Sequence, residues 1–382
     1  MTVADVKRVS FSPDRLHVEW ADGSLSEFAS LWLRDNLRED RDPHSGQRLI
    51  DIADLPQSPK IRAATAHNGC VSLDWADGER TATFELDWLL AHSSSHGGRR
   101  RGRAHRLWLE AAGLAATRDF AWAVCNELAG HRAARAHWLT RLLQDGLGFL
   151  SDVPRNDAGI LEAARLAGRV AETNYGLVFE VRSVAQPENL AYSDLGLGLH
   201  TDNPYREPVP GFQMLHVLIA SPDGGESLFG DGFAIAEHLR STDREAFAVL
   251  TQTAVPFLYR SKDAELYAER PLIQLSCDGE VTAVHYNSRS IAPLQRDARE
   301  CERFYRAYRR FASLLRDPRF QLRFMLRDGD LAVFDNQRIL HGRTAFSSSR
   351  FARHLRGCYL TRDSVYSQAA LLRREFPVDE PS

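Results

Sequence analysis

The chain has 382 residues, and 43% of them are apolar, which is enough for one large domain with a full core and a second, smaller domain. Its 48 basic and 51 acidic residues leave a net charge of −3, which gives no general electrostatic reason to bind nucleic acid or an anionic membrane. We therefore expect a globular protein that acts on a small molecule.

The start of the chain and its cysteines bear on where the protein works. The opening segment MTVADVKRVSF lacks the charged and then apolar pattern of a signal peptide, and the most apolar run, FQMLHVLIA, is too short to cross a bilayer. Five cysteines lie far apart without a CxxC pair, which argues against a disulfide framework or a cysteine zinc site. We predict a cytoplasmic protein with reduced thiols.

The first hundred residues contain an internal repeat. Residues 15–33 read RLHVEWADGSLSEFASLWL, and residues 70–90 read CVSLDWADGERTATFELDWLL. In each, two runs of alternating apolar residues flank the turn sequence WADG, which is the pattern of a β-hairpin. We predict a small β-rich domain over residues 1–93 and, from the basic, glycine-containing stretch that follows, an exposed linker over residues 94–105. The linker arginines could also contact nucleic acid, but no basic surface elsewhere supports such a partner.

Residues 106–382 predict one larger domain. Up to residue 172, apolar residues spaced near 3.6 predict helices that buttress a sheet, in LWLEAAGLAA, DFAWAVCNELAG, AARAHWLTRLLQDG and AGILEAARLAGRVAE. Beyond residue 175, short apolar runs such as LVFEVRSV, FQMLHVLIA and DLAVFDN alternate with turn residues and with two helical insertions, IAEHLRSTDREAFAVLTQ and ARECERFYRAYRRFASLLRD. This pattern predicts a mostly β fold with helices, a sandwich or jelly roll rather than a βαβ fold.

A histidine and an aspartate follow one of the apolar runs, in LGLHTDNPYRE. His200 and Asp202 lie on the same side of an extended chain, although such HxD triplets also occur by chance. His341 follows another strand-like run and a turn, in DLAVFDNQRILHGRTAF. Two imidazoles and one carboxylate can occupy one face of Fe(II) and leave three positions open. A jelly roll could bring His341 beside the other two ligands.

The sequence resembles the iron(II)- and 2-oxoglutarate-dependent dioxygenases, specifically the γ-butyrobetaine and trimethyllysine hydroxylase branch of the TauD/TfdA-like family. The resemblance implies a double-stranded β-helix (a cupin-like jelly roll) and hydroxylation of an unactivated C–H bond, with 2-oxoglutarate and O2 as cosubstrates. It also implies that His200, Asp202 and His341 bind Fe(II). The segments that carry it are WLRDN (32–36), TNYGLVFEV (173–181), ENLAYSDLGLGLHTDNPY (188–205), PGFQMLHVL (210–218), GGESLFGDGF (224–233), DNQRILHGRTAF (335–346) and RHLRGCYL (353–360).

The resemblance also assigns residues to 2-oxoglutarate. It implies that Arg353 pairs with the distal carboxylate, which a guanidinium can meet through two parallel hydrogen bonds. Arg353 lies 12 residues after His341, enough for the chain to turn and run back toward the metal, whereas the alternative is a surface ion pair. Ser227, which follows the GG pair, could add a hydroxyl hydrogen bond near the same cosubstrate.

Aromatic residues match the family positions that hold a trimethylammonium group. Such a cation cannot donate hydrogen bonds, so aromatic faces hold it by cation–π attraction of roughly 0.5–2 kcal/mol per ring. Any one of these rings alone would more often pack a core, but their joint match to the cage positions reverses that preference. Asn203 departs from the pattern, because some members place another tyrosine directly after the metal-binding aspartate. The matching residues are Tyr175, Phe179, Tyr192 and Tyr359.

The substrate's acidic tail has its own matching residues, Asn189 and Asn287. Arg289, two residues further along, is either a solvated arginine or a further contact suited to a more highly charged tail such as a phosphonate. The first substrate candidate is therefore γ-butyrobetaine, giving carnitine. The alternative is 2-(trimethylamino)ethylphosphonate, hydroxylated next to phosphorus. A sulfonate or aryloxyacid dioxygenase would have no use for the aromatic cage, and a non-enzymatic binding protein would not need the metal ligands and Arg353.

A second departure concerns the small domain, where family members often bind zinc through three cysteines and a histidine. Those positions hold Leu37, Glu39, Asp42 and Glu79 here, and a leucine cannot ligate zinc. We predict no structural zinc, with ordinary polar contacts in its place. A homodimer is common among relatives, but the residue pattern identifies no interface.

Overall fold

The protein is described from a computed structural model, which covers residues 5–78, 81–93, 105–114, 119–182, 196–221, 223–346 and 353–378. The chain divides into two compact units, residues 1–102 and 103–382. Residues 94–104 of the predicted linker lie outside the described residues.

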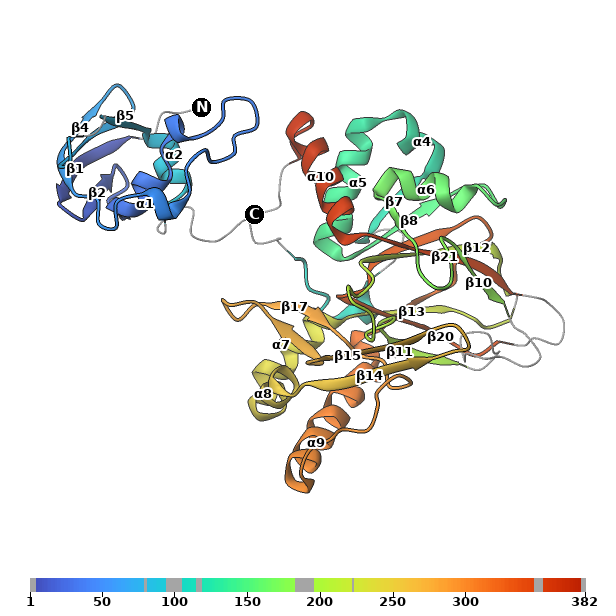
Figure 1. The fold of residues 1–382 in the computed structure, drawn as a ribbon. Helices are drawn as coiled ribbons and strands as arrows, with labels where there is room; N and C mark the ends of the chain where they lie inside the picture. The colour runs from blue at the N-terminus through green and yellow to red at the C-terminus, as the bar shows by residue number, and fades with distance from the viewer. Residues whose placement is uncertain are drawn as a thin grey trace. The chain divides into compact units, whose positions relative to one another are not determined.

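The N-terminal unit consists of two antiparallel three-stranded sheets, each followed by a short helix (Figure 1). Both predicted hairpins are confirmed, and Gly23 and Gly78 of the two WADG turns have the positive φ angles, 84° and 80°, that favour glycine. Trp20, Phe28 and Trp75 are buried between the elements. The elements are β1 (Val6–Ser12), β2 (Arg15–Trp20), β3 (Leu25–Ala29), α1 (Ser30–Asp35), η1 (Arg38–Asp40), η2 (Ile52–Asp54), β4 (Ile61–His67), β5 (Cys70–Trp75), β6 (Ala82–Glu85) and α2 (Leu86–Ala91).

The second unit is built on two sheets that form the predicted jelly roll. The larger sheet has the order β10-β21-β12-β19-β8-β7, with β9 also paired to β21. The smaller sheet has the order β11-β20-β13-β18. The larger sheet contains β7 (Ala121–Val124), β8 (Leu147–Ser151), β9 (Val170–Ala171), β10 (Phe179–Arg182), β12 (Phe212–Ile219), β19 (Leu331–Asp335) and β21 (His354–Leu360), and the smaller contains β11 (Leu197–His200), β13 (Ser227–Asp231), β18 (Leu322–Phe324) and β20 (Ile339–Arg343).

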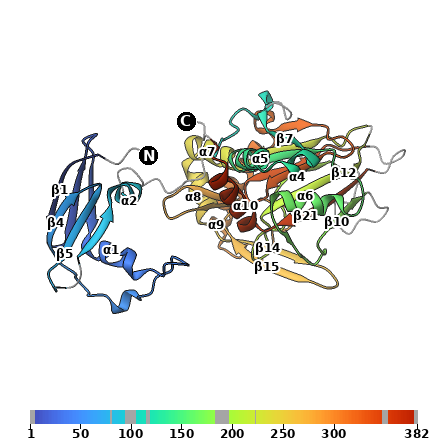
Figure 2. The same cartoon turned by 90° about the horizontal axis from the view of Figure 1, so that it is seen from above.

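Apolar side chains hold the two sheets together. Phe149, Phe334 and Leu355 of the larger sheet and Phe229 of the smaller sheet belong to one buried cluster, so the sheets pack face to face. On the outer side of the larger sheet lie α4 (Cys125–Gly130), α5 (Arg132–Asp145), α6 (Gly159–Ala167) and α10 (Arg362–Glu375), as Figures 1 and 2 show. The predicted helical buttress is therefore present over residues 125–167.

A third cluster of elements packs beside the smaller sheet. It comprises α7 (Gly232–Thr242), α8 (Arg244–Gln252), α9 (Ala298–Leu315), the hairpins β14 (Val255–Arg260) with β15 (Glu265–Arg270) and β16 (Ile273–Leu275) with β17 (Val281–Val284), and the turn η5 (Pro318–Phe320). The first predicted helical insertion consists of α7 and α8, and the Asp243 side chain between them accepts a hydrogen bond from Ala246 N and caps the start of α8.

One part of the sequence prediction is wrong. The pattern predicts helices over most of residues 106–124, but within the described residues 106–114 and 120–124 the structure has the short turn η3 (Ala111–Gly113) and strand β7, which pairs in parallel with β8. Residues 115–118 lie outside the described residues. The buried Arg338 guanidinium donates to Arg106 O at 2.7 Å, and Trp108 N donates to Asp231 Oδ2 at 3.2 Å. These long-range bonds satisfy the backbone groups that a helix would use, and they outweigh a weak alanine propensity.

The loop after α1 occupies the region where the family resemblance implies zinc ligands. Leu37 is buried in the core of the N-terminal unit. Asp42 accepts hydrogen bonds from the backbone N–H groups of His44 and Ser45, and Arg48 pairs with Asp35 at 2.6 Å. Glu39 is exposed, and Glu79 lies outside the described residues. The protein's own packing and ion pairs therefore hold this loop.

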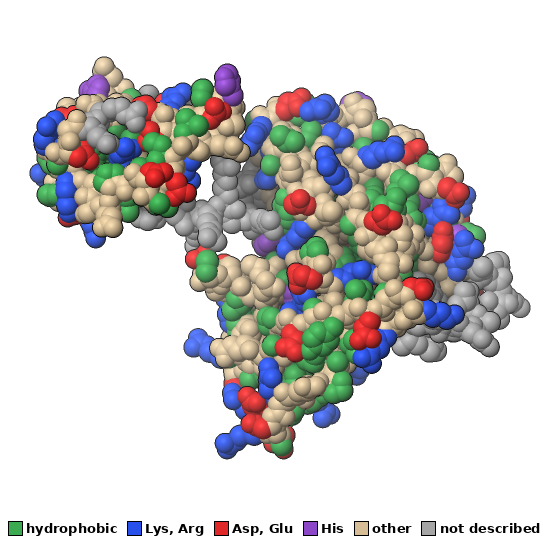
Figure 3. Space-filling model, viewed as in Figure 1, with side chains coloured by type: hydrophobic (Ala, Val, Ile, Leu, Met, Phe, Trp, Pro, Cys, Tyr) green, Lys and Arg blue, Asp and Glu red, His purple; other side chains and the backbone are tan. Residues whose placement is uncertain are grey.

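Two further observations concern possible partners. Within the described part of the chain, no helix combines the length and apolar character that crossing a bilayer requires. Figure 3 shows basic and acidic side chains interspersed over the face that it displays, which matches the small net charge.

Candidate active site

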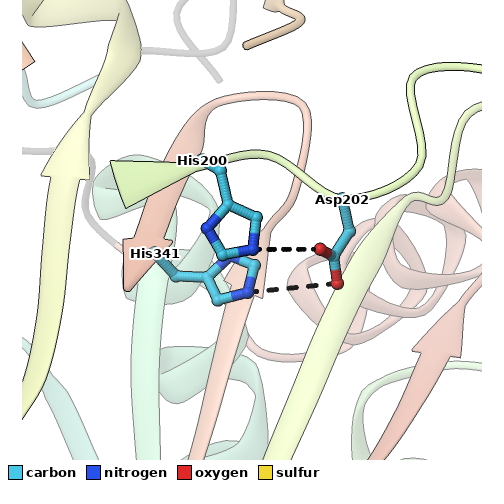
Figure 4. Close-up of side chains that lie close together, drawn as sticks. All are labelled: His200, Asp202 and His341. Carbon is cyan, nitrogen blue, oxygen red and sulfur yellow. Dashed lines mark ion pairs between the residues drawn. The ribbon is translucent and has the colours of Figure 1, made fainter. Parts of the chain in front are cut away.

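The two histidines and the aspartate predicted from the sequence meet at one end of the smaller sheet (Figure 4). His200 ends β11 and is the register partner of His341 on the neighbouring strand β20. Asp202 lies two residues beyond β11, with its Oδ1 3.3 Å from His200 Nε2 and its Oδ2 3.9 Å from His341 Nε2. One ligand atom from each residue lies within 4.8 Å of the others, so a single ion could contact all three.

The backbone around these three residues is held in place by close strand contacts. Asn336 clamps Asp202, because its Oδ1 accepts from Asp202 N at 2.7 Å and its Nδ2 donates to Asp202 O at 3.0 Å. A Cβ atom at Gly342 would lie 2.4 Å from Leu197 O, so β11 can approach β20 this closely only because residue 342 is glycine. The sequence HGR therefore supplies both a ligand and the space beside it.

The protonation of the three residues suits a divalent metal. Burial lowers the pKa of His341 to about 3, and the neighbouring His200 adds to the effect, so its imidazole is neutral and can donate a lone pair. Burial opposes ionisation of Asp202, but the electrostatic effect of the adjacent His341 and His200 and the hydrogen bond from Tyr359 outweigh it and hold the pKa of Asp202 well below its usual range. His200 Nδ1–H donates to Gly198 O at 3.0 Å, which turns Nε2 toward the other ligands.

The cavity beside the metal ligands contains a buried positive charge. Arg353 and Ser227 line the same cavity as the three metal ligands, and each is 8% exposed. Burial and the nearby Arg343 lower the pKa of Arg353 to about 10, so it remains a cation at neutral pH. A buried guanidinium in such a cavity is suited to a carboxylate.

Sequence reasoning missed Arg343. It is 6% exposed, lines the same cavity and is the register partner of Ser227. Both Arg343 and Arg353 lie over the ring of Phe346, with their guanidinium carbons 5.1 and 5.7 Å from its centroid. Arg343 lies two residues after His341 and therefore on the same side of a strand, and this spacing was the signal that could have identified it from the sequence.

Three of the four predicted cage residues cluster next to the metal ligands. The rings of Phe179 and Tyr359 lie 5.1 Å apart, and those of Tyr175 and Phe179 lie 6.4 Å apart. Phe179 pairs with Gly357 across β10 and β21, and a Cβ atom at residue 357 would lie 2.3 Å from the Phe179 ring. Gly357 therefore gives the ring its space. The fourth residue, Tyr192, lies outside the described residues, as does Asn189.

Two further tyrosines extend this aromatic cluster and were not predicted. Tyr205 stacks on Tyr259 with their centroids 5.1 Å apart, and Tyr175 meets Tyr259 edge-on at 6.1 Å. Tyr205 was visible in the segment HTDNPY, but nothing near Tyr259 in the sequence indicates its place here. Asn203 is buried and its side chain lies between Tyr205 and Tyr359.

Asn287 and Arg289, both considered for binding the acidic tail, differ in whether their side chains already have partners within the protein. The amide of Asn287 is used within the protein, since its Nδ2 donates to Thr201 O at 3.0 Å and its Oδ1 accepts from Arg289 N at 3.2 Å. The Arg289 side chain is exposed, and it forms no ion pair with any residue that the structure describes. Although the residue is exposed overall, partial desolvation by the surrounding protein lowers the pKa of its guanidinium, and Asp202 opposes that shift. The charge of Arg289 in turn contributes to the lowered pKa of His341, which places the guanidinium near the metal ligands.

Comparisons with known proteins agree with this geometry. The model of the taurine catabolism dioxygenase TauD, TfdA family matches residues 121–359, and a gamma-butyrobetaine hydroxylase-like N-terminal model matches residues 8–90. The chain belongs to the TauD/TfdA family. It is a 2-oxoglutarate-dependent dioxygenase that uses Fe(II) and O2, as the sequence resemblance implied.

Two relatives and one solved structure show the extent of the similarity. The chain is 35% identical over 364 residues to a gamma-butyrobetaine dioxygenase of Pseudomonas sp. (strain AK-1), covering 94% of this chain and 93% of the relative. It is 26% identical over 392 residues to a trimethyllysine dioxygenase of Meyerozyma guilliermondii, covering 97% of each. Among solved structures, asparagine oxygenase with Fe(II), 2S,3S-3-hydroxyasparagine and succinate aligns with a TM-score of 0.48 at 19% identity, covering 72% of this chain and 89% of that one.

Proposed function

We propose that this dioxygenase hydroxylates an unactivated C–H bond of a small trimethylammonium compound with an acidic tail, and that γ-butyrobetaine, giving carnitine, is its substrate. The observation that carries the proposal is the contact of Tyr175, Phe179 and Tyr359 with one another directly beside the metal ligands. The name of the Pseudomonas relative, and its 35% identity, support the same substrate.

The metal and the cosubstrate have separate places in the site. His200, Asp202 and His341 would hold Fe(II), since they offer two imidazoles and a carboxylate around a common point. Iron with 2-oxoglutarate and O2 supplies the oxidation of the C–H bond. Arg353 would bind the far carboxylate of 2-oxoglutarate, and burial makes that ion pair stronger than it would be in water.

The protein's part in selectivity is positioning. Aromatic faces hold the trimethylammonium group and exclude water from it, with each ring contributing about 0.5–2 kcal/mol. An anion contact at the other end fixes the distance from the cation, and that distance decides which carbon faces the metal. Because the reacting C–H bond carries no charge, these two anchors alone place it.

A second substrate candidate is favoured by Arg289. An exposed guanidinium near the metal ligands, with no ion pair among the described residues, suits the second negative charge of a phosphonate. The corresponding compound is 2-(trimethylamino)ethylphosphonate, hydroxylated at the carbon next to phosphorus. The two candidates share the trimethylammonium cation and differ in the anion and in the number of methylene groups between the two charges.

The test measures succinate and hydroxylated product after O2 is added to the iron-loaded protein with 2-oxoglutarate and either compound. Turnover of γ-butyrobetaine alone supports the first candidate, and turnover of the phosphonate alone supports the second. Turnover of neither would refute the proposal. Arg289→Ala should lower kcat/KM for the phosphonate about 10- to 100-fold if the guanidinium binds it. The control Arg296→Ala removes an exposed arginine whose guanidinium donates to Gln295 O, and it should have no effect.

A non-enzymatic binding role is tested by His200→Ala. The variant should lose turnover while its circular dichroism and thermal midpoint show a folded protein. Retained turnover would refute the assignment of His200 as a metal ligand. Retained affinity for the trimethylammonium compound is expected, because the aromatic cluster does not include His200.

A further inference from the structure

A chain of hydrogen bonds runs from the aromatic cluster to the metal-binding carboxylate. Tyr359 OH donates to Asp202 Oδ2 at 2.9 Å, and Asn203 Nδ2 donates to Tyr359 OH at 3.1 Å. Tyr205 OH donates to Asn203 Oδ1 at 2.6 Å, and the hydroxyl of Tyr175 lies 3.5 Å from that of Tyr205. Asn203 is the central link of this chain.

The chemistry of the groups fixes the direction of these bonds. Ionised Asp202 can only accept hydrogen bonds, so the single hydroxyl proton of Tyr359 points to it. The Tyr359 oxygen can then only accept, and the amide of Asn203 must turn its Nδ2 toward it and its Oδ1 toward Tyr205. Burial raises the pKa of Tyr205 to about 12 and that of Tyr359 well above its usual range, so both hydroxyls keep their protons.

The backbone at Asn203 is unusual in the same place. Its φ angle is 54°, in the left-handed region that asparagine tolerates better than most residues. The residue directly follows Asp202 and is 7% exposed. The left-handed turn therefore places a buried amide beside a metal ligand and within reach of Tyr205 and Tyr359. The position calls for a side chain that tolerates a positive φ angle and can both donate and accept a hydrogen bond, which asparagine provides.

We infer that Asn203 is a positioning residue that acts through Tyr359 on Asp202 and links the aromatic cage to the metal site. It holds the Tyr359 hydroxyl on the carboxylate and, with the same bond, fixes the Tyr359 ring against Phe179. The metal-binding effect is independent of the substrate, whereas the effect on the cage rests on the proposed function. Loss of the Asn203 amide should therefore weaken both the hydrogen bond from Tyr359 to Asp202 and the packing of the Tyr359 ring against Phe179.

The main variant is Asn203→Gly, which permits the left-handed backbone and removes the side chain with its amide. It should weaken Co(II) binding to the metal-free protein about 3- to 10-fold, as expected for one neutral hydrogen bond lost beside a ligand. Tyr359→Phe removes the direct bond to Asp202 and should weaken Co(II) binding about 10- to 100-fold. The absorbance of bound Co(II) measures both without any turnover.

The double variant Asn203→Gly/Tyr359→Phe separates positioning from a general structural effect. If Asn203 acts through the Tyr359 hydroxyl, the double variant binds Co(II) no more weakly than Tyr359→Phe alone. Additive losses, or unchanged Co(II) affinity in Asn203→Gly, would overturn the inference. If Asn203→Gly does not fold, Tyr205→Phe serves instead, because it frees Asn203 Oδ1 while leaving the backbone unchanged, and it should shift Co(II) affinity in the same direction.

The effect of Asn203 on the aromatic cage is measured with the iron-loaded enzyme. Asn203→Gly should form several-fold less hydroxylated product per succinate with the substrate that the wild-type protein turns over, because a looser Tyr359 ring holds the cation less firmly. An unchanged ratio refutes the link to the cage. Since Co(II) affinity involves no substrate, a wrong substrate proposal and a wrong role for Asn203 give different results.

Discussion

Replacing Arg353 with lysine should weaken the binding of 2-oxoglutarate. The arginine is 8% exposed and lines the cavity that also contains Asp202 and His341. Lysine keeps the positive charge but cannot offer two parallel N–H groups to one carboxylate. A charge-assisted hydrogen bond contributes about 1.5–3 kcal/mol, so losing one of two corresponds to about a 10- to 100-fold rise in the dissociation constant.

The assay is the dependence of succinate formation on the 2-oxoglutarate concentration. KM for 2-oxoglutarate should rise by that factor with kcat changed much less, because the far carboxylate is bound equally before and during reaction. Arg323→Lys is the matched control, since Arg323 forms an exposed ion pair with Glu226 at 2.6 Å and such pairs contribute about 0–1 kcal/mol. An unchanged KM in Arg353→Lys would refute the assignment of Arg353 to the cosubstrate.

Two further predictions concern the cage and the core. Gly357→Ala should raise KM for the trimethylammonium substrate without weakening 2-oxoglutarate binding, because the added Cβ would lie 2.3 Å from the Phe179 ring; Gly130→Ala, where nothing lies within 4 Å of the new atom, should leave both constants unchanged. Burial lowers the pKa of His216 from 6.5 to about 4, so the unfolded chain binds more protons than the folded one between these pH values and stability should fall as pH drops through that range. Urea unfolding at several pH values should show a loss of about 3 kcal/mol, because one pKa unit corresponds to about 1.4 kcal/mol. The loss should be smaller in His216→Gln, and an equal pH dependence in the variant contradicts the role of His216.

Local sequence pattern determined the elements and most of the metal site. The hairpins of the N-terminal unit were predictable because alternation around an Asp-Gly turn depends only on neighbouring residues. His200 and Asp202 were predictable as a pair because their spacing on a strand places them on one side. His341 and Arg353 could be added only through the resemblance to a family, since their distance from His200 in the chain gives no contact by itself.

The tertiary structure decided what depends on contacts between distant residues. Residues 106–114 and 121–124 have helical composition, yet hydrogen bonds from Arg338 and to Asp231 hold the first stretch in a non-helical conformation, and pairing with β8 makes the second a strand. Tyr259 joins the aromatic cluster through a stacking contact 54 positions from Tyr205, which no local period encodes. The amide of Asn203 gains its role only because folding brings Tyr359 beside it, 156 residues further along the chain. The sequence shows which chemical groups are available to the site, but which groups contact one another depends on strand pairing and packing between residues far apart in the chain.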